Sequence, residues 1–302
     1  MSFLPPAMPG PSSLEELAAE AAESSEGALR RRYVARRLLR SPTFMVGGGI
    51  LLFWVFMALF STHVTKFGPL DIDPYHTLKG VSRLHWFGTD ENGRDVLSRT
   101  LAGARSVLVV APLATLFCLA LGGMIGLIAG YYRGYADEII MRFVDVLLSL
   151  PVIVAAIVVV SALGASTAVV ILVIGVLFTP PVARTIRAAV VAEREKEYVA
   201  AARLRGERTW FIMLAEILPN VTSPIIVEGT VRLGYAVFTA ATLSFLGFGI
   251  QPPSPDWGLT ISQERAVIQV AWWAVLFPAL ALASLVVGAN LLADALRRVL
   301  SE

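Results

Sequence analysis

Side chains that could carry out catalysis are few in this sequence, and their spacing assembles no reactive site. Ser161 and Ser244 lie in apolar stretches, but none of the three histidines lies in such a stretch to activate a serine. The sequence has no Gly-x-x-x-x-Gly-Lys phosphate loop, no HExxH motif and no GxSxG motif. We therefore predict that the chain holds no catalytic residues and no ATP site of its own.

Side chains that bind metals are equally sparse. His63, His76 and His85 are separated by 13 and 9 residues, spacings that match no helical metal pair. Cys118 is the single cysteine, which excludes a disulfide framework and a cysteine-based metal site. We expect no metal ligand and no cofactor in this chain.

One pair of opposite charges lies inside an apolar stretch. Glu228 and Arg232 are four residues apart, which places them on one face of a helix. A charge in hydrocarbon costs at least about 2.5 kcal/mol, so the two side chains should face each other and the interior of a helix bundle. They either line a route for a solute that carries both charge signs, or hold helices together.

The composition explains why such charges are rare. Hydrophobic residues make up 56% of the chain and charged residues 16%, whereas soluble domains average about 25% charged residues. The formal net charge of +2 excludes a strongly basic nucleic-acid binder. The sequence therefore predicts an integral membrane protein embedded in a lipid bilayer.

Six stretches are long and apolar enough to cross a hydrocarbon core of about 30 Å. Alternating ten-residue segments, the signature of a membrane barrel, are absent, so an all-α protein with six transmembrane helices is predicted. The predicted spans are residues 43–61, 106–131, 143–163, 167–189, 219–247 and 271–296.

The distribution of arginine predicts the orientation. Residues 1–28 contain no Lys or Arg and are predicted to form a disordered tail, and residues 29–42 form a basic segment. Positive charge stays on the cytoplasmic side, so six spans place both termini in the cytoplasm. The six-helix transmembrane domain, 43–302, then has a long external loop at 62–105 and a long cytoplasmic loop at 190–218.

Small and helix-breaking residues interrupt several spans. Pro112, Pro151 and the pair Pro180–Pro181 each remove a backbone donor and are expected to kink their helices. A stripe of small residues permits close helix contact; its members are Gly122, Gly123, Gly126 and Gly130.

The cytoplasmic loop carries the first resemblance to a known family. Three alanines at 200–202 are followed by Gly206, and Leu218-Pro219-Asn220 closes the segment. This pattern resembles the loop of the inner-membrane permeases of binding-protein-dependent ABC importers, which carries Glu-Ala-Ala, three residues, Gly and a hydrophobic stretch ending in Leu-Pro. Ala200 stands where the family has glutamate, a departure that removes one charge from the loop.

Three further segments resemble permeases of dipeptide, oligopeptide and nickel importers, more narrowly the second or "C" permease of their heteromeric pair. They are residues 85–105, 134–151 and 243–258, and the resemblance covers about residues 35–300 in order. In the external segment the matching residues include Gly88, Asp90, Gly93, Arg94, Asp95 and Arg99.

The resemblance implies a type I ABC importer permease fold and a set of partners. These are a homologous second permease, one or two ATPase subunits that hold ATP and Mg²⁺, and an extracytoplasmic peptide-binding protein, all at a bacterial plasma membrane. The loop would couple the permease to an ATPase, with contacts expected from Ala200, Ala201, Ala202, Arg203, Arg205, Gly206 and Arg208.

Two alternatives remain open on the sequence. Nickel permeases share the same motifs, so nickel is the second candidate cargo after peptides. A self-contained channel or secondary transporter often shows internal repeats and ionisable residues at the midplane. This chain shows no clear repeat, and only Glu228 and Arg232 lie deep in a span.

Overall fold

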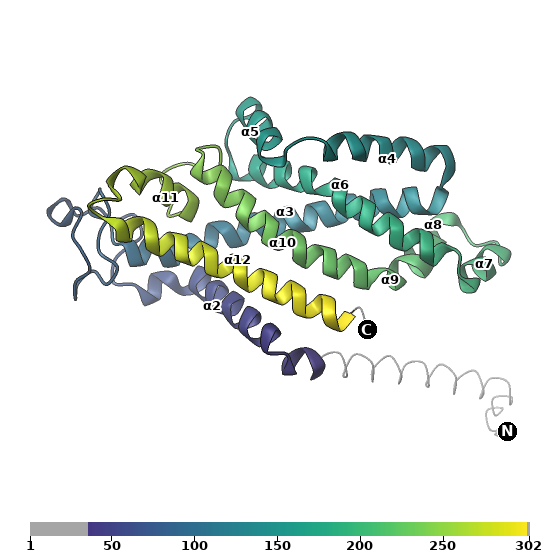
Figure 1. Cartoon of the computed structure of the whole chain (residues 1–302), viewed down its shortest axis with the longest axis horizontal. Coiled ribbons are helices and arrows are strands. Elements are labelled where there is room, and N and C mark those ends of the chain that lie inside the picture. Colours follow the sequence, from purple (N-terminus) through teal and green to yellow (C-terminus); the bar gives the residue numbers. More distant parts are fainter. Residues whose placement is uncertain (1–35, 301–302) are drawn as a thin grey trace, which may run out of the picture.

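The computed structural model describes residues 36–300 and shows an elongated bundle of helices (Figure 1). The predicted tail at 1–28, and residues 29–35 of the basic segment, lie outside the described residues. Four helices are each long and apolar enough to cross a membrane: α2 (Pro42–Val64), α3 (Val96–Tyr132), α6 (Thr167–Arg194) and α12 (Trp272–Leu300). Two bent helix pairs complete the six predicted spans when each pair is counted as one.

The third span is not the single helix predicted for residues 143–163. The chain forms α4 (Gly134–Leu148) and α5 (Val152–Leu163), which are bent by 89° relative to each other. Pro151 causes the break, since it has no N–H to donate and disfavours helical backbone in the residue before it. With 12 residues, α5 is about 18 Å long and too short to cross a bilayer alone.

Other prolines do not break their helices. Pro112 lies inside α3, and Pro180 and Pro181 lie inside α6, and both helices continue through them. Of the four prolines expected to interrupt spans, only Pro151 ends a helix.

The fifth span also contains a bend, at residue 221. A run of short helical pieces comes first: α8 (Thr209–Phe211), the π-helix η2 (Ile212–Ile217) and α9 (Leu218–Asn220). This run is bent by 68° against α10 (Thr222–Phe245). The polar part of the predicted 190–218 loop is therefore shorter than expected, because α6 continues to Arg194 and helix resumes at Thr209.

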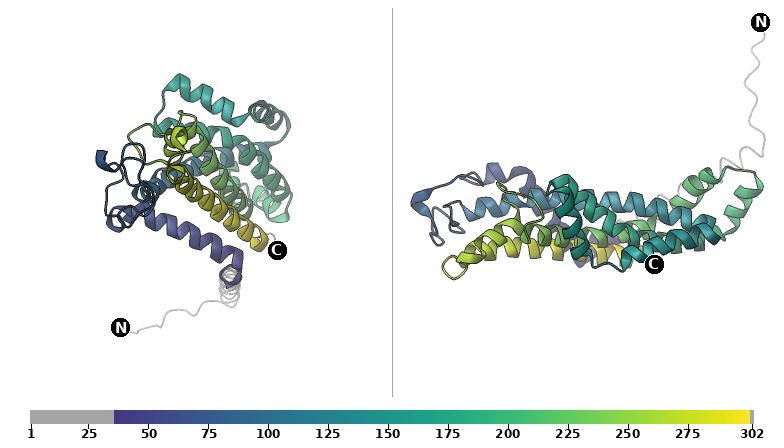
Figure 2. Two further views of the ribbon diagram at one scale, coloured as in Figure 1. Left: turned by 60° about the vertical axis from the view of Figure 1, so that its left-hand side comes forward. Right: turned by 90° about the horizontal axis from the view of Figure 1, so that it is seen from above.

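The two ends of the bundle carry different short elements (Figures 1 and 2). At one end lie the 65–95 segment with its short η1 helix (Pro74–His76), α11 (Trp257–Glu264) and η3 (Arg265–Val267). At the opposite end lies α7 (Glu197–Leu204). The fold therefore separates the two motif-bearing loops by the full length of the spans.

The core of the bundle is the contact between α3 and α6, and glycine makes it possible. A Cβ atom at Gly122 would lie 2.8 Å from the Thr179 carbonyl oxygen, and one at Gly126 would lie 2.6 Å from that of Ala183. One at Gly130 would lie 2.8 Å from Val190 Cβ. Gly123 differs, because its nearest neighbour would be the end of the Ile186 side chain at 3.6 Å. The predicted small-residue stripe is confirmed at three of its four positions.

These two kinds of glycine give a matched test of the packing. Gly126→Ala should lower the melting temperature, because overpacking a tight contact costs about 1–3 kcal/mol, against about 1 kcal/mol gained in helix propensity. Gly123→Ala should leave it unchanged or raise it. Thermal unfolding of the detergent-solubilised protein measures both, and equal stability of the two variants would contradict the proposed α3–α6 contact.

Candidate functional site

The inner face of α7 is fixed to the end of the bundle. Tyr198 donates a hydrogen bond to Glu193 at the end of α6 (2.9 Å) and accepts one from Asn220 of α9 (3.2 Å). Burial, followed by the Glu193 carboxylate, raises the pKa of Tyr198 to about 12, so the phenol stays protonated and keeps donating. Arg203 lies over the ring of Tyr131, with 5.4 Å between its guanidinium carbon and the ring centroid. A displacement of α7 would therefore be transmitted to α3, α6 and α9.

The outer face of α7 is exposed. Ala200 and Ala201 are exposed while Ala202 is fully buried, and Leu204 is 89% exposed. Gly206 follows the helix with a φ of 75°, a backbone conformation that favours glycine and turns the chain toward α8. The structure therefore divides the three predicted alanines between the inner and outer faces.

The three arginines expected to contact an ATPase, Arg203, Arg205 and Arg208, are all exposed. Arg205 also pairs with Glu207 and Glu216, at 2.6 and 3.4 Å. Ala200, which stands where the family has glutamate, is exposed. A glutamate at this position would therefore point away from the bundle.

The charge pair in the fifth span is formed as predicted. Arg232 Nε donates to Glu228 Oε1 at 2.7 Å, and Thr185 of α6 donates to the second carboxylate oxygen at 3.4 Å. Arg232 also lies over the rings of Phe178 and Tyr235, at 5.9 and 5.4 Å from their centroids. The pair connects α10 to α6 and leaves part of the Arg232 side chain exposed.

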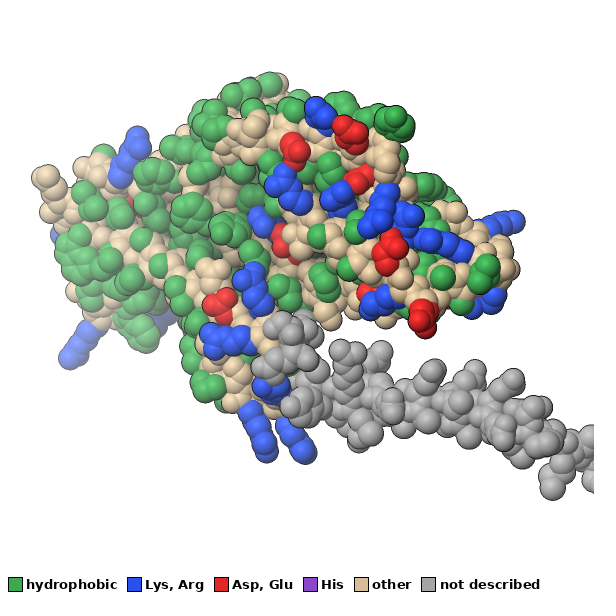
Figure 3. Space-filling view, turned by 45° about the vertical axis from the view of Figure 1, so that its right-hand side comes forward, with side chains coloured by type: hydrophobic (Ala, Val, Ile, Leu, Met, Phe, Trp, Pro, Cys, Tyr) green, Lys and Arg blue, Asp and Glu red, His purple; other side chains and the backbone are tan. Residues whose placement is uncertain are grey.

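Two ion pairs that the sequence did not predict join α4 to α6. Arg187 binds Asp137 and Arg184 binds Asp145, so the amphipathic α4 lies against α6. On the face drawn in Figure 3, charged side chains gather over one part of the molecule and apolar side chains cover most of the remainder. No sequence signal pairs these residues, since they are 50 and 39 positions apart.

The external motif forms a tight turn before α3. Asp90 Oδ1 accepts hydrogen bonds from the backbone N–H groups of Asn92 and Arg94, at 2.9 and 2.8 Å. Gly88 and Gly93 have φ values of 75° and 73°, and a Cβ at Gly93 would lie 1.9 Å from the Asp73 carbonyl oxygen. The backbone conformation therefore favours glycine at both positions.

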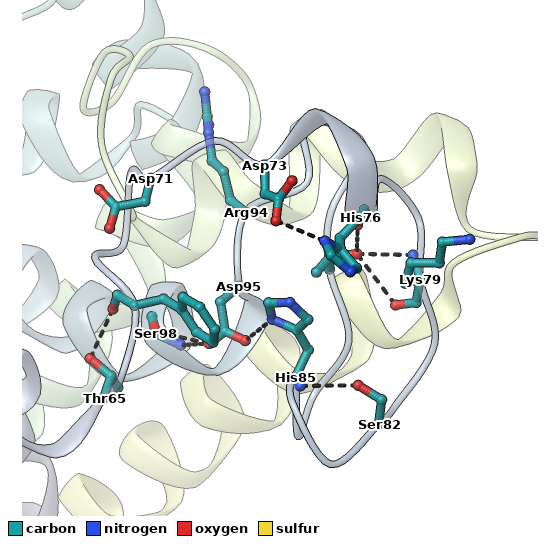
Figure 4. Close-up of polar contacts among 12 residues, drawn as sticks. Thr65, Asp71, Asp73, His76, Lys79, Ser82, His85, Arg94, Asp95 and Ser98 are labelled. Carbon is teal, nitrogen blue, oxygen red and sulfur yellow. Dashed lines mark hydrogen bonds and ion pairs between the residues drawn. The ribbon is translucent and has the colours of Figure 1, made fainter.

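Asp95 anchors this turn to the start of α3 (Figure 4). Its carboxylate caps the helix by accepting from the Ser98 N–H at 2.8 Å, and it binds His85 Nδ1 at 2.9 Å. The side chain of Arg94 points away from this pair. His85 is therefore a buried structural partner of Asp95, a contact across ten residues that the histidine spacing did not reveal.

A second group of charged side chains at this end of the bundle lies around Arg99. Its guanidinium is buried 3.6 Å from Asp90 Oδ2 and donates to Thr260 of α11 at 3.0 Å. Glu264, at the end of α11, is 1% exposed and accepts from the Glu91 N–H at 3.2 Å. Burial, followed by the nearby Asp90 charge, raises the pKa of Glu264 to about 7. Sequence reasoning missed Glu264, which lies 165 residues from Arg99 in the chain.

Groups of three or more metal-binding side chains do not occur among residues 36–300. The closest approach of two histidines is His76 and His85, whose ring centroids lie 5.7 Å apart. Each of these rings is hydrogen-bonded to an aspartate, Asp73 and Asp95 respectively.

Glu264 should make stability depend on pH. Its folded-state pKa of about 7 exceeds the ordinary value of 4.5, so its stabilising contribution is complete below about pH 4.5 and is lost as pH rises through 7. Glu264→Gln should flatten the fall in melting temperature between about pH 5 and 8. The exposed Glu197→Gln serves as control, and an unchanged profile in Glu264→Gln would contradict the assignment.

Curated relatives match this chain over most of its length. A dipeptide transport system permease protein, DppC, of Alkalihalophilus pseudofirmus is 38% identical over 269 residues, covering 89% of this chain and 88% of the relative. A glutathione transport system permease protein, GsiD, of Pectobacterium atrosepticum is 37% identical over 266 residues, covering 88% of each chain. A di/tripeptide permease of Pseudomonas aeruginosa is 38% identical, covering 84% of this chain and 86% of the relative.

A solved structure and two family models agree with these relatives. A chain of the MetNI methionine ABC transporter, in inward-facing conformations, has the same fold with a TM-score of 0.52 and 16% identity, covering 66% of this chain and 96% of the other. Residues 30–80 match the N-terminal transmembrane domain of oligopeptide transport permease C. Residues 122–302 match the binding-protein-dependent transport system inner membrane component. The chain therefore belongs to the family of inner-membrane permeases of binding-protein-dependent transport systems.

Proposed function

We propose that this permease carries peptides across a bacterial plasma membrane as one half of a heterodimeric, ATP-driven importer. The full-length relatives are dipeptide, di/tripeptide and glutathione permeases, which favours a peptide cargo over nickel. The family membership also favours a subunit of a larger machine over a self-contained channel. A homologous permease, ATPase subunits that hold ATP and Mg²⁺, and an extracytoplasmic binding protein complete the proposed assembly.

The observation that carries this proposal is the two-sided structure of α7. Its inner face is bonded to α3, α6 and α9, and its outer face presents Ala200, Ala201 and Leu204. Such a helix suits a coupling element that an ATPase pushes or pulls as it closes. With α7 on the cytoplasmic side, the opposite end of the bundle faces the binding protein, and both termini lie in the cytoplasm.

The ATPases supply energy that the permease needs to change state. Inverting a 1:99 preference between two conformations takes about 5.5 kcal/mol, more than weak binding of a small cargo provides. Two spans are bent, at Pro151 and at residue 221. The helices on either side of these bends are the parts of the permease that would change their relative angle between the two conformations.

Purification from native membranes tests the proposal directly. The tagged chain should co-purify with a second permease and ATPases, and in proteoliposomes peptide plus the binding protein should stimulate ATP hydrolysis. Stimulation by nickel in place of peptide would change the cargo. A chain that purifies alone and passes solute down a gradient would overturn the importer.

The outer face of α7 gives a sharper prediction. Leu204→Arg should abolish co-purification of the ATPase, because burying an unpaired charge in an interface costs several kcal/mol. The same change at an equally exposed position of the opposite end, Tyr75→Arg, should not affect it. Ala200→Glu, which supplies the family glutamate at an exposed site, should leave ATPase binding intact or strengthen it. ATPase retained by Leu204→Arg would exclude this face.

The Glu228–Arg232 pair is proposed to line the translocation route. Removing one partner of a buried pair costs about 3–5 kcal/mol, so Glu228→Gln and Arg232→Gln should each lower the yield of folded protein. The double variant leaves no unpaired charge and should recover most of that yield.

Uptake then separates the route from a purely structural pair. In proteoliposomes, the folded double variant should import peptides at least about tenfold more slowly, or with an altered preference for charged peptides, if the pair contacts cargo. Normal uptake and unchanged preference in the double variant would leave the pair with a structural role only.

A further inference from the structure

A groove opens sideways between α2 and α3, and one of its walls carries a single basic residue. Its volume is about 410 Å³, within the range of about 300–1,000 Å³ that small-molecule sites occupy. Val55, Ala58 and Leu59 of α2 form one wall, and Leu108, Val109 and Pro112 of α3 form the other. Arg105 lies among them, and Val55, Leu59 and Val109 are 42%, 69% and 42% exposed. The groove is therefore open at the surface of the bundle.

Arg105 lacks the partners that other arginines near the spans have. Arg99, six residues earlier, lies 3.6 Å from Asp90, and Arg232 binds Glu228. Arg105 makes no hydrogen bond, ion pair or ring contact with any residue from 36 to 300. A cation beside hydrocarbon is unfavourable without an anion, so this groove is electrostatically incomplete.

The depth of Arg105 matches the surface of a bilayer. The apolar stretch predicted to cross the membrane begins at Ser106, so Arg105 is the last residue before it. On α2 the polar residues Thr62 and His63 follow just after Leu59, at the same end. From Arg105 the groove extends seven residues along α3 to Pro112, about 10 Å toward the middle of the span.

This arrangement fits the two parts of a phospholipid. A guanidinium donates several N–H groups in a planar fork that matches a phosphate. Below it, the apolar walls can cover part of an acyl chain. Next to the groove, both helices carry further exposed apolar side chains, which suits a surface covered by lipid tails. These are Leu52, Phe56, Leu113 and Leu116.

We propose that the groove between α2 and α3 binds an anionic phospholipid, with its phosphate on Arg105 and one acyl chain between Ala58 and Leu108. The lipid supplies the anion that the chain does not provide. It also fills part of the seam between α2 and α3.

Native mass spectrometry of the assembled importer tests this proposal. The complex is reconstituted in nanodiscs containing equal amounts of phosphatidylglycerol and phosphatidylcholine, then released, and the lipids that remain bound are counted. Phosphatidylglycerol should be retained in preference to phosphatidylcholine. Arg105→Gln should lower its occupancy about tenfold, the equivalent of one charge-assisted hydrogen bond, and Ala58→Trp should lower it by filling the groove.

Arg83→Gln is the matched control, since Arg83 is an exposed arginine of the 65–95 segment that precedes α3 and lies outside the groove. It should keep the wild-type lipid count. Equal retention of the two lipids, unchanged occupancy in Arg105→Gln, or an equal loss in Arg83→Gln would overturn the proposal. So would a cross-link from position 105 to an acidic residue of the second permease, because that residue would then be the missing anion.

Discussion

The close contact between α3 and α6 is the constraint on which the remaining structure depends. In a bilayer no hydrophobic effect draws helices together, so association relies on close packing of backbones. Three glycines of α3 let this helix approach α6 more closely than a methyl group at the same positions would permit; they are Gly122, Gly126 and Gly130. α4 lies against both α3 and α6, and α5 lies against α6. α2 and α10 lie against α3 and α12. α6 also ends at Glu193 and Arg194, the residues that hold α7 and the end of α3.

Water does not solvate charged side chains inside the bundle, so the buried ones pair with other polar groups of the chain. Several buried charges have a charged partner from another element or another turn: Asp95 with His85, Arg99 with Asp90, Glu228 with Arg232. Glu264 is instead hydrogen-bonded to the Glu91 backbone N–H, and burial, followed by the nearby Asp90 charge, raises its pKa to about 7. The end of the bundle that holds α11 is therefore a network of charges and turns that joins α3, α11 and α12, while the opposite end presents one helix, α7, with an exposed outer face.

These two ends suit a protein that transmits motion along its length. At the α11 end, Trp257 and Trp273 donate to the carbonyls of Thr100 and Thr89, at 2.7 and 3.0 Å, and connect α11 and α12 to α3 and the turn before it. At the other end, contacts of Tyr198 and Arg203 connect α7 to α3, α6 and α9. Between the ends, the bent pairs at Pro151 and residue 221 leave breaks in two of the spans. In the proposed importer, a force on α7 would thus reach the spans directly.

The sequence alone determined the membrane setting, the number of spans, the glycine contact and the pairing of Glu228 with Arg232, because each follows from local composition or from helical spacing. Only the tertiary structure decided that Arg184 and Arg187 of α6 pair with Asp145 and Asp137 of α4, that Tyr198 binds Asn220 while Leu204 is exposed, and that Glu264 accepts from the Glu91 N–H. Those outcomes depend on contacts between residues tens to hundreds of positions apart, and hydropathy and short-range periodicity carry no information about such pairs.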